Sequence, residues 1–272
     1  MTTPATPSLL VLERGETPDS FYLTVEPHHC VGPDDGMFLF GGVTMGAGLQ
    51  ALERACGRDP AWASAQYVGP AHSGDRVTLN VKRSRTGKGI TVAKVGVSSP
   101  NGPVGRISAA LGTGREYGEG QWRIAPDAPP PAQLPDGHHW RMKTGLHGEM
   151  EVKVAHGRYG LDRIGKPTAD GRLVFWIRPK QLRIDKVFLA TIADYVPTGI
   201  GNALGRHSGG RSLDNTFRLI GLGDTEWVLA EVSINAISNG LVHGDIALFA
   251  DDGQLMALGS QTLVLVHHDK GE

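Results

Sequence analysis

Short runs that alternate hydrophobic and polar residues recur along the chain, and they predict two similar series of β-strands. In the first half the runs span 21–25, 62–68, 76–86, 89–98 and 104–111. In the second half they span 150–154, 173–177, 212–219, 227–235, 240–250 and 255–266. A period of two is typical of strands that bury one face, so both halves predict antiparallel sheets.

An apolar stretch long enough for a central helix precedes the main strands of each half. The first runs from Phe40 to about Gly57, and its small residues Gly46 and Gly48 require close packing because glycine weakens a helix. The second covers 186–204 and is interrupted by Pro197. The order strand, helix, antiparallel strands in both halves predicts an α+β fold with one long helix per sheet.

The two halves also correspond residue by residue. The segment 89–102 aligns with 240–253, and both turns end in a glycine, as a tight hairpin with positive φ demands. The strands that follow, 104–111 and 255–262, align at the same offset. We therefore interpret the chain as a tandem duplication. Two antiparallel sheets, each wrapping a helix, are the arrangement called a double hotdog.

Composition places the boundaries between these units. The polar start of the chain predicts a loose N-terminal arm over 1–18, and the first unit is expected over 19–121. The proline-rich segment predicts a linker over 122–145, because proline removes a backbone donor and restricts its neighbour. The second unit is expected over 146–272.

The overall charge and the cysteines limit the classes of partner. The net charge of −1 gives no general attraction to nucleic acid or to an anionic membrane, so neither is expected as a partner. Two isolated cysteines, Cys30 and Cys56, predict neither a disulfide framework nor a zinc site. The sequence shows no secretory segment, and we expect a cytoplasmic protein with free thiols that forms at least a homodimer.

Several short segments carry a family resemblance that spans about residues 20–266. They are Phe40-Gly41-Gly42, 70–75, Ser212-Leu213-Asp214, 227–229 and Asp252 through Gln261. In order and spacing they resemble the TesB-like (type II) acyl-CoA thioesterases, a double-hotdog family. The resemblance implies an acyl-CoA substrate and no cofactor or metal.

In that family an Asp on a strand of the second half, a Thr or Ser on the next strand and a Gln on the last strand orient the hydrolytic water. The resemblance places Asp214 and Gln261 on the first and last positions. Asn235 occupies the middle position, a departure that a carboxamide can tolerate because it both donates and accepts hydrogen bonds. Ser233 is the alternative on the same strand.

Other residues receive roles around this expected trio. The backbone amide at Gly42, at the start of the first helix, is expected to donate to the oxyanion, and Tyr67, where relatives carry a His, to form a pocket wall. Arg206 and Arg211, or the cluster at 82–88, are expected to bind the phosphates of coenzyme A. Asp194 lies inside an apolar run and must have a partner; we interpret it as a structural hydrogen-bonding residue.

The function expected on this basis is hydrolysis of an acyl-CoA thioester by direct attack of water. A Gly-x-Ser-x-Gly elbow is missing from the sequence, and the adjacent histidine pairs at 28–29, 138–139 and 267–268 lack the spacing of metal ligands. Two alternatives stay open. One is a non-catalytic acyl-CoA or lipid-binding protein, and the other is an enoyl-CoA hydratase or dehydratase on the same fold.

Overall fold

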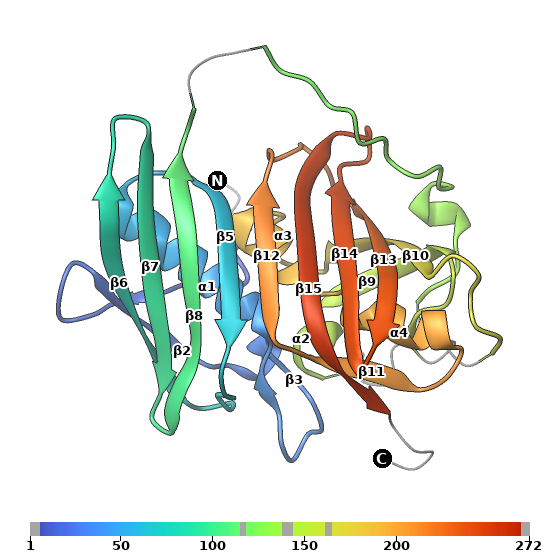
Figure 1. Ribbon diagram of the computed structural model, residues 1–272, viewed down its shortest axis with the longest axis horizontal. Coiled ribbons are helices and arrows are strands. Elements are labelled where there is room, and N and C mark those ends of the chain that lie inside the picture. Colours follow the sequence, from blue (N-terminus) through green and yellow to red (C-terminus); the bar gives the residue numbers. More distant parts are fainter. Residues whose placement is uncertain (1–5, 115–117, 138–143, 161–164, 268–272) are drawn as a thin grey trace, which may run out of the picture.

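One continuous antiparallel sheet forms most of the molecule (Figure 1). The computed structural model describes residues 6–114, 118–137, 144–160 and 165–267. The first half of the sheet runs in the order β1 (Glu13–Arg14), β2 (Ser20–Thr24), β6 (Arg76–Thr86), β7 (Ile90–Ser99), β8 (Gly102–Gly112) and β5 (Pro60–Tyr67). The second half continues with β12 (Asp214–Leu219), β15 (Leu255–His267), β14 (Leu241–Phe249), β13 (Val228–Ser238), β10 (Arg172–Pro179) and β9 (Met150–His156).

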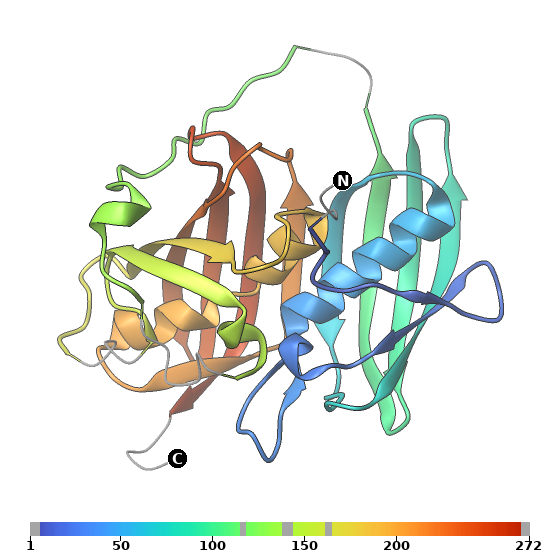
Figure 2. The same cartoon turned by 180° about the vertical axis from the view of Figure 1, so that it is seen from behind.

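The helices lie together on one face of this sheet (Figure 2). They are α1 (Gly41–Cys56), α2 (Gly145–Gly148), α3 (Lys186–Ile192) and α4 (Pro197–Leu204). The remaining short elements are β3 (Cys30–Val31), β4 (Phe38–Leu39), β11 (Ser208–Ser212), and the 3₁₀ turns η1 (Pro27–His29) and η2 (Pro131–Gln133). Each half of the sheet packs against its own helices, so the chain is a double hotdog, as its strand pattern predicts.

The two hairpins used to align the halves are confirmed. β7 pairs with β8 and β14 pairs with β15, both antiparallel. Gly102 and Gly253, the last residues of the two turns, have φ of 130° and 85°. Glycine adopts such angles without the steric cost that a Cβ brings, which explains its use at both turns.

The helix expected over 186–204 is two helices. Asp185 caps α3, its Oδ1 accepting from the Phe188 N–H at 3.0 Å, and α3 ends at Ile192. Proline has no N–H and is favoured in the first turn of a helix, so Pro197 begins α4 instead of continuing α3. The four residues between the helices include Asp194, which is thereby placed at an irregular turn.

The strand expected over 212–219 is also interrupted. β11 ends at Ser212 and β12 begins at Asp214, and both pair with β15. Ser212 lies opposite Leu263 and Thr216 opposite Ser260, so four residue steps on one side face three on the other. Leu213 is the extra residue, a β-bulge. Because side chains alternate between faces, one inserted residue places Ser212 and Asp214 on opposite faces of the sheet.

The small residues of α1 serve two different contacts. A Cβ on Gly42 would collide with the Thr191 carbonyl oxygen of α3, and one on Gly46 would lie 3.0 Å from Val187. A Cβ on Gly48 would collide instead with Ile107 of β8. The helix α1 therefore approaches both its own sheet and α3 of the other half. The sequence predicts close packing of this helix but not its two partners.

The arm packs on α1, through hydrogen bonds of Leu12 with Gln50 and Arg54, and the linker packs on the sheet. The side chains of Leu9, Leu10 and Leu12 are buried, so the arm is not loose over these residues. The linker lies along the outer face of the second half, on a small core that includes Trp176, whose Nε1 donates to the Pro129 carbonyl at 2.9 Å. In the same region the buried carboxylate of Glu231 accepts from Arg123 and Arg172.

Gly42→Ala tests the contact between α1 and α3. Helix propensity alone favours alanine by about 1 kcal/mol, whereas overpacking typically costs about 1–3 kcal/mol. Since the new methyl group would meet backbone, we expect a net loss in the free energy of unfolding, measured by chemical denaturation. Gly96→Ala, with no atom within 4 Å of the new Cβ, is the matched control and should be neutral or stabilising. Equal stability of both variants would contradict the contact.

Candidate active site

A buried carboxylate lies where the two halves meet. Asp194, in the turn after α3, is 1% exposed. Its carboxylate accepts hydrogen bonds from the backbone N–H of Gly42, the side chain of Gln261 and the side chain of Ser212. The first of these donors comes from the N-terminal half, at the start of α1, and the other two from β15 and β11. The carboxylate is thus fixed by elements of both halves.

The amide of Gln261 links the members of this cluster. Its Nε2 donates to Asp194 Oδ1 and lies 3.3 Å from Ser212 Oγ. Gln261 is buried, and its Oε1 has no hydrogen-bond partner among the described residues. An unpaired buried acceptor is costly, and a water molecule is the simplest group that could pair with it. Ser212 is partly exposed, so the cluster reaches the surface on that side.

The electrostatics of Asp194 suit a base that works near neutral pH. Burial raises the pKa of its carboxyl from 3.8 to about 7, and the hydrogen bonds that it accepts offset part of that rise. A carboxylate with such a pKa removes a proton from water more readily than an exposed one and is still substantially ionised at pH 7. The arrangement can therefore orient a water molecule and accept one of its protons.

Asp214 lies next to this cluster in sequence but on the other face of the sheet. Its Oδ1 accepts from the backbone N–H of Thr262 at 2.7 Å, whereas the neighbouring Gln261 points into the interior. The expectation that Asp214 and Gln261 meet at one water is therefore corrected. The physical reason is the bulge at Leu213, which an uninterrupted strand pattern does not reveal.

Asn235 is likewise not brought to Gln261. It is exposed at an irregularity of β13 between Ile234 and Ala236, and its Nδ2 donates to Asp245 Oδ2 at 2.6 Å. Ser233, the alternative, lies opposite Asp245 on β14 and does not reach the cluster either. The hydroxyl side chain that contacts Gln261 is instead that of Ser212. Ser212 belongs to the segment Ser212-Leu213-Asp214 that carries the family resemblance, and it lies before Asp214 and not on the strand after it.

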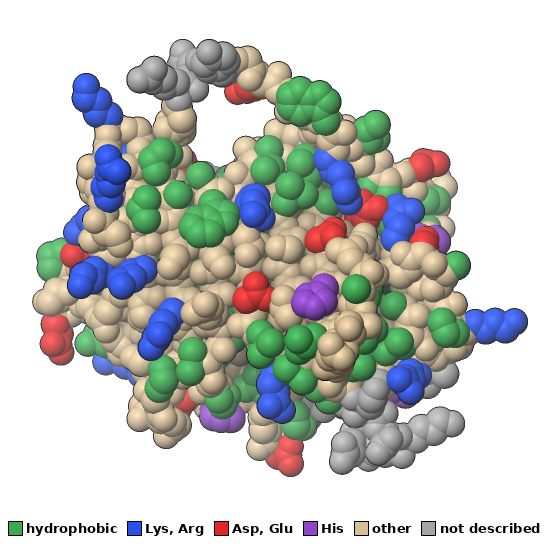
Figure 3. Space-filling model, viewed as in Figure 1, with side chains coloured by type: hydrophobic (Ala, Val, Ile, Leu, Met, Phe, Trp, Pro, Cys, Tyr) green, Lys and Arg blue, Asp and Glu red, His purple; other side chains and the backbone are tan. Residues whose placement is uncertain are grey.

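The remaining predicted residues divide between the cluster and the surface. Gly42 is at the cluster, but its N–H donates to Asp194 and not to an open position. Tyr67 is at the cluster too, a partly exposed residue with a buried hydroxyl. Arg206 and Arg211 are exposed near the ends of β11. Basic side chains also gather over β6 and β7, at the far edge of the first half (Figure 3), where Arg83 pairs with Asp19 at 2.8 Å.

The sequence did contain a signal for Asp194. A carboxylate inside an apolar run must find partners or change its pKa, and groups with a shifted pKa concentrate at functional sites. The sequence alone favours a structural role for Asp194, because the residues that bind its carboxylate come from distant parts of the chain. The separation between Asp194 and Gln261 is 67 residues, and Gly42 is in the other half.

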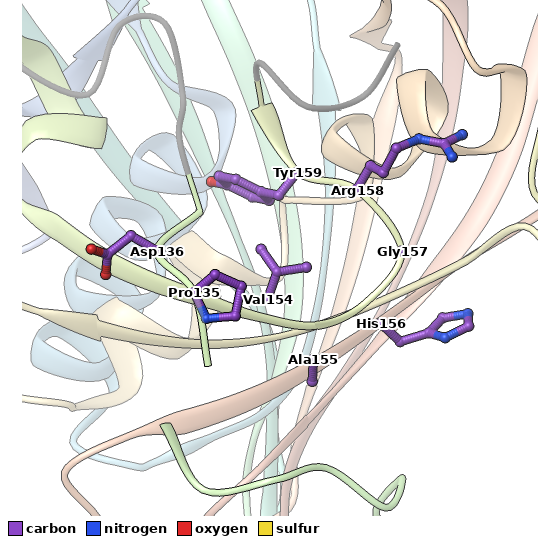
Figure 4. A pocket seen from close by; sticks show the side chains of 8 residues that line it. All are labelled: Pro135, Asp136, Val154, Ala155, His156, Gly157, Arg158 and Tyr159. Atoms are coloured by element: carbon purple, nitrogen blue, oxygen red, sulfur yellow. The ribbon is translucent and has the colours of Figure 1, made fainter. Parts of the chain in front are cut away.

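A surface hollow of about 410 Å³ lies elsewhere, beside β9 (Figure 4). It is lined by Pro135, Asp136, Val154, Ala155, His156, Gly157, Arg158 and Tyr159. His156 and Arg158 extend to one side of it, and Asp136 and Tyr159 to the other. The rings of Tyr159, Phe175 and Tyr195 form a row of neighbours from this hollow toward Asp194, with centroids 5.3 and 6.4 Å apart.

Other kinds of site are not seen in the described part of the chain. Its histidine, cysteine and acidic side chains form no group of three able to hold a metal ion. The pairs at 138–139 and 267–268 lie wholly or partly outside the described residues. The described helices are too short or too polar to cross a membrane.

The geometry defines a class: a double-hotdog protein with one buried carboxylate at the junction of its halves. The sequence matches the acyl-CoA thioesterase N-terminal domain over residues 32–113 and the acyl-CoA thioesterase C-terminal domain over residues 126–265. The chain therefore belongs to the acyl-CoA thioesterase family and is a thioester hydrolase. None of the curated proteins matches the sequence.

Solved structures support the same assignment of the fold. A proposed thioesterase from Novosphingobium aromaticivorans is 27% identical, with a TM-score of 0.82 over 97% of this chain and 99% of that one. A hotdog protein of unknown function from Alicyclobacillus acidocaldarius is 19% identical, with a TM-score of 0.83 over 98% and 100%. The acyl-CoA thioesterase II TesB2 from Mycobacterium marinum is 19% identical, with a TM-score of 0.72 over 96% and 98%.

The raised pKa of Asp194 predicts a pH-dependent effect on stability. Between about pH 4 and pH 7 the folded protein keeps this proton and the unfolded chain has lost it, so the free energy of unfolding falls as pH rises. The slope from this group is about 1.4 kcal/mol per pH unit. Asp194→Asn removes the charge, so we expect the variant to exceed the wild type in Tm at pH 8 and to approach it at pH 5. A Tm difference that does not change with pH would contradict the buried charge.

Proposed function

We propose that the protein hydrolyses an acyl-CoA thioester to free coenzyme A and a carboxylic acid by direct attack of water. The observation that supports this proposal is the buried carboxylate of Asp194, held by Gln261 and Ser212 and raised in pKa to about 7. Hydrolysis needs a water fixed near the carbonyl carbon and a base within reach of it. This cluster supplies both without a nucleophilic side chain.

In the proposed reaction, Asp194 accepts a proton from the water while the water oxygen bonds to the carbonyl carbon. The electron pair of the carbonyl moves to its oxygen, giving a tetrahedral intermediate. The pair then returns, the carbon–sulfur bond breaks, and the proton held by Asp194 passes to the departing sulfur. Gln261 and Ser212 orient the carboxylate and the water through the hydrogen bonds described above. Water adds to the acyl group, and a thiol leaves.

The hydratase alternative receives no support at this site. Adding water to a double bond next to a thioester needs an acid placed to protonate carbon as well as a base placed for the water. The groups that donate to the Asp194 carboxylate in the described part of the chain are an amide, a hydroxyl and a backbone N–H, and none of these is an acid or base near neutral pH.

The non-catalytic alternative predicts saturable binding of acyl-CoA without release of thiol.

Binding of coenzyme A by Arg206 and Arg211 remains a proposal, supported by their exposure at opposite ends of β11, the strand that ends at Ser212. We also propose a cytoplasmic location, supported by the free thiols of Cys30 and Cys56. We also propose a homo-oligomer, since β1 ends the sheet of the first half as an edge strand. Light scattering of the purified protein would test the last point.

The first functional test is a panel of acyl-CoA thioesters, with release of free thiol as the readout. The wild type should turn over at least one chain-length class. Asp194→Asn should lower kcat by about 10²–10⁴-fold, the usual contribution of a general base. Asp214→Asn is the matched control, an aspartate 20 residues away on the outer face, and should keep most of the activity. The reverse ranking of the two variants would assign the base to Asp214.

The pH dependence of the same reaction tests the role of the carboxylate. If Asp194 must be ionised, kcat/KM should rise about tenfold per pH unit below its pKa and level off above about pH 7. The rising limb should be missing from the residual activity of Asp194→Asn. A profile of the wild type that is flat from pH 5.5 to 8.5 would count against a base with this pKa.

A further inference from the structure

Tyr67 presents an unpaired hydroxyl to the buried carboxylate. It is the last residue of β5, in the first half, and its backbone N–H donates to the Leu213 carbonyl of the second half at 3.0 Å. The residue as a whole is partly exposed, but its hydroxyl oxygen is buried and has no hydrogen-bond partner among the described residues. The polar end of the side chain is therefore directed into the interior.

The hydroxyl faces the same small space as Asp194. Gly41, the first residue of α1, has no side chain, and a Cβ there would lie 2.5 Å from Asp194 Oδ2 and 3.2 Å from Tyr67 Oη. Both oxygens thus border one position above the helix N-terminus. The buried Asn215 of β12 lies close enough to the hydroxyl to lower its pKa, but neither atom of its amide has the geometry of a hydrogen bond.

The hydroxyl of Tyr67 is a hydrogen-bond donor without an acceptor among the described residues. Burial, and then the charge of Asp194, raise the pKa of Tyr67 well above its ordinary value, so the phenol keeps its proton. Leaving such a donor unpaired costs free energy unless a bound group accepts from it. The oxyanion of a tetrahedral intermediate is an acceptor of this kind. The donor expected from the sequence for that purpose, the N–H of Gly42, is already used by Asp194.

We propose, building on the proposed function, that Tyr67 is a catalytic residue whose hydroxyl donates a hydrogen bond to the thioester carbonyl oxygen as that oxygen becomes negative. No proton is transferred from the phenol: the hydrogen bond strengthens while water adds and weakens when the carbon–sulfur bond breaks. Asn215, the neighbouring buried amide, is the positioning residue that orients the phenol once the hydroxyl has its acceptor. The N-terminal half thus contributes a reacting group to a site whose base lies in the C-terminal half.

Tyr67→Phe removes only the hydroxyl and is the direct test. We expect kcat for the best acyl-CoA of the panel to fall about 10²–10³-fold, the effect of losing one oxyanion donor, with KM changed less than about threefold. Tyr195→Phe is the matched control, because Tyr195 also carries a buried hydroxyl without a partner among the described residues. It should keep kcat within about threefold of the wild type, and melting curves should show both variants folded.

The outcomes separate this inference from the function on which it rests. One outcome is that Asp194→Asn is inactive while Tyr67→Phe keeps the wild-type kcat and changes at most in KM. Tyr67 is then only a wall of the pocket, so the inference is overturned while the proposed function stands. If no acyl-CoA of the panel releases thiol with the wild type, the proposed function itself fails. Equal losses of kcat in Tyr67→Phe and Tyr195→Phe would show a general packing effect and also overturn the inference.

A double-mutant cycle tests the role given to Asn215. Asn215→Leu keeps a side chain of similar size and removes the amide, and it should lower kcat less than Tyr67→Phe does. If the amide acts through the phenol, adding Asn215→Leu to Tyr67→Phe should lower kcat no further. Losses that multiply in the double variant would show that Asn215 does not act through Tyr67.

Discussion

The pairing of β5 with β12 is the interaction on which the rest of the structure depends. It joins the two halves in one sheet, with Gln66 opposite Asp214 and Trp62 opposite Arg218. It also fixes the distance between the two sets of helices, so that α1 and α3 meet through glycines that leave no space between their backbones. Leu213 lies at the end of this seam as an extra residue, and its carbonyl accepts from Tyr67. The seam and the bulge together decide which side chains face the interior at the junction.

The same geometry explains why the described part of this duplicated chain has one cluster of a buried aspartate and a glutamine, and not two. The duplication aligns Asp194 with Gly46 and Gln261 with Ala110, so the first half lacks both the carboxylate and the amide. At Gly46 a side chain would press against Val187, because α1 approaches α3 there. The residue that allows the helices to pack closely therefore occupies the position of the base. One half supplies the carboxylate and the other supplies the helix end and the phenol, a division of roles that a symmetric pair of sites would not permit.

Burial gives the carboxylate its chemistry and its cost. Asp194 is almost fully buried, so the ionised form is disfavoured and the pKa of its carboxyl rises to about 7. Three donors, drawn from α1, β11 and β15, reduce this cost without removing it. Groups that gain and lose a proton during a reaction are often placed where their charged form is disfavoured, because this shifts their pKa toward the working pH. The partly exposed Ser212 and Tyr67 are the residues through which this buried group meets the surface.

The sequence by itself determined the duplication, the hairpins at Gly102 and Gly253, the α+β order of elements and the inward position of Gln261, because alternation and turn glycines are local signals. The family followed from the same segments, and the comparisons confirm it. Only the tertiary structure decided which aspartate accompanies Gln261. Asp194 meets its partners across 67 residues and across the two halves, and Asp214 is turned outward by one inserted residue that changes no local pattern. Contacts between distant segments and a shift of register are properties of the packed sheet, and alternation along one strand cannot report them.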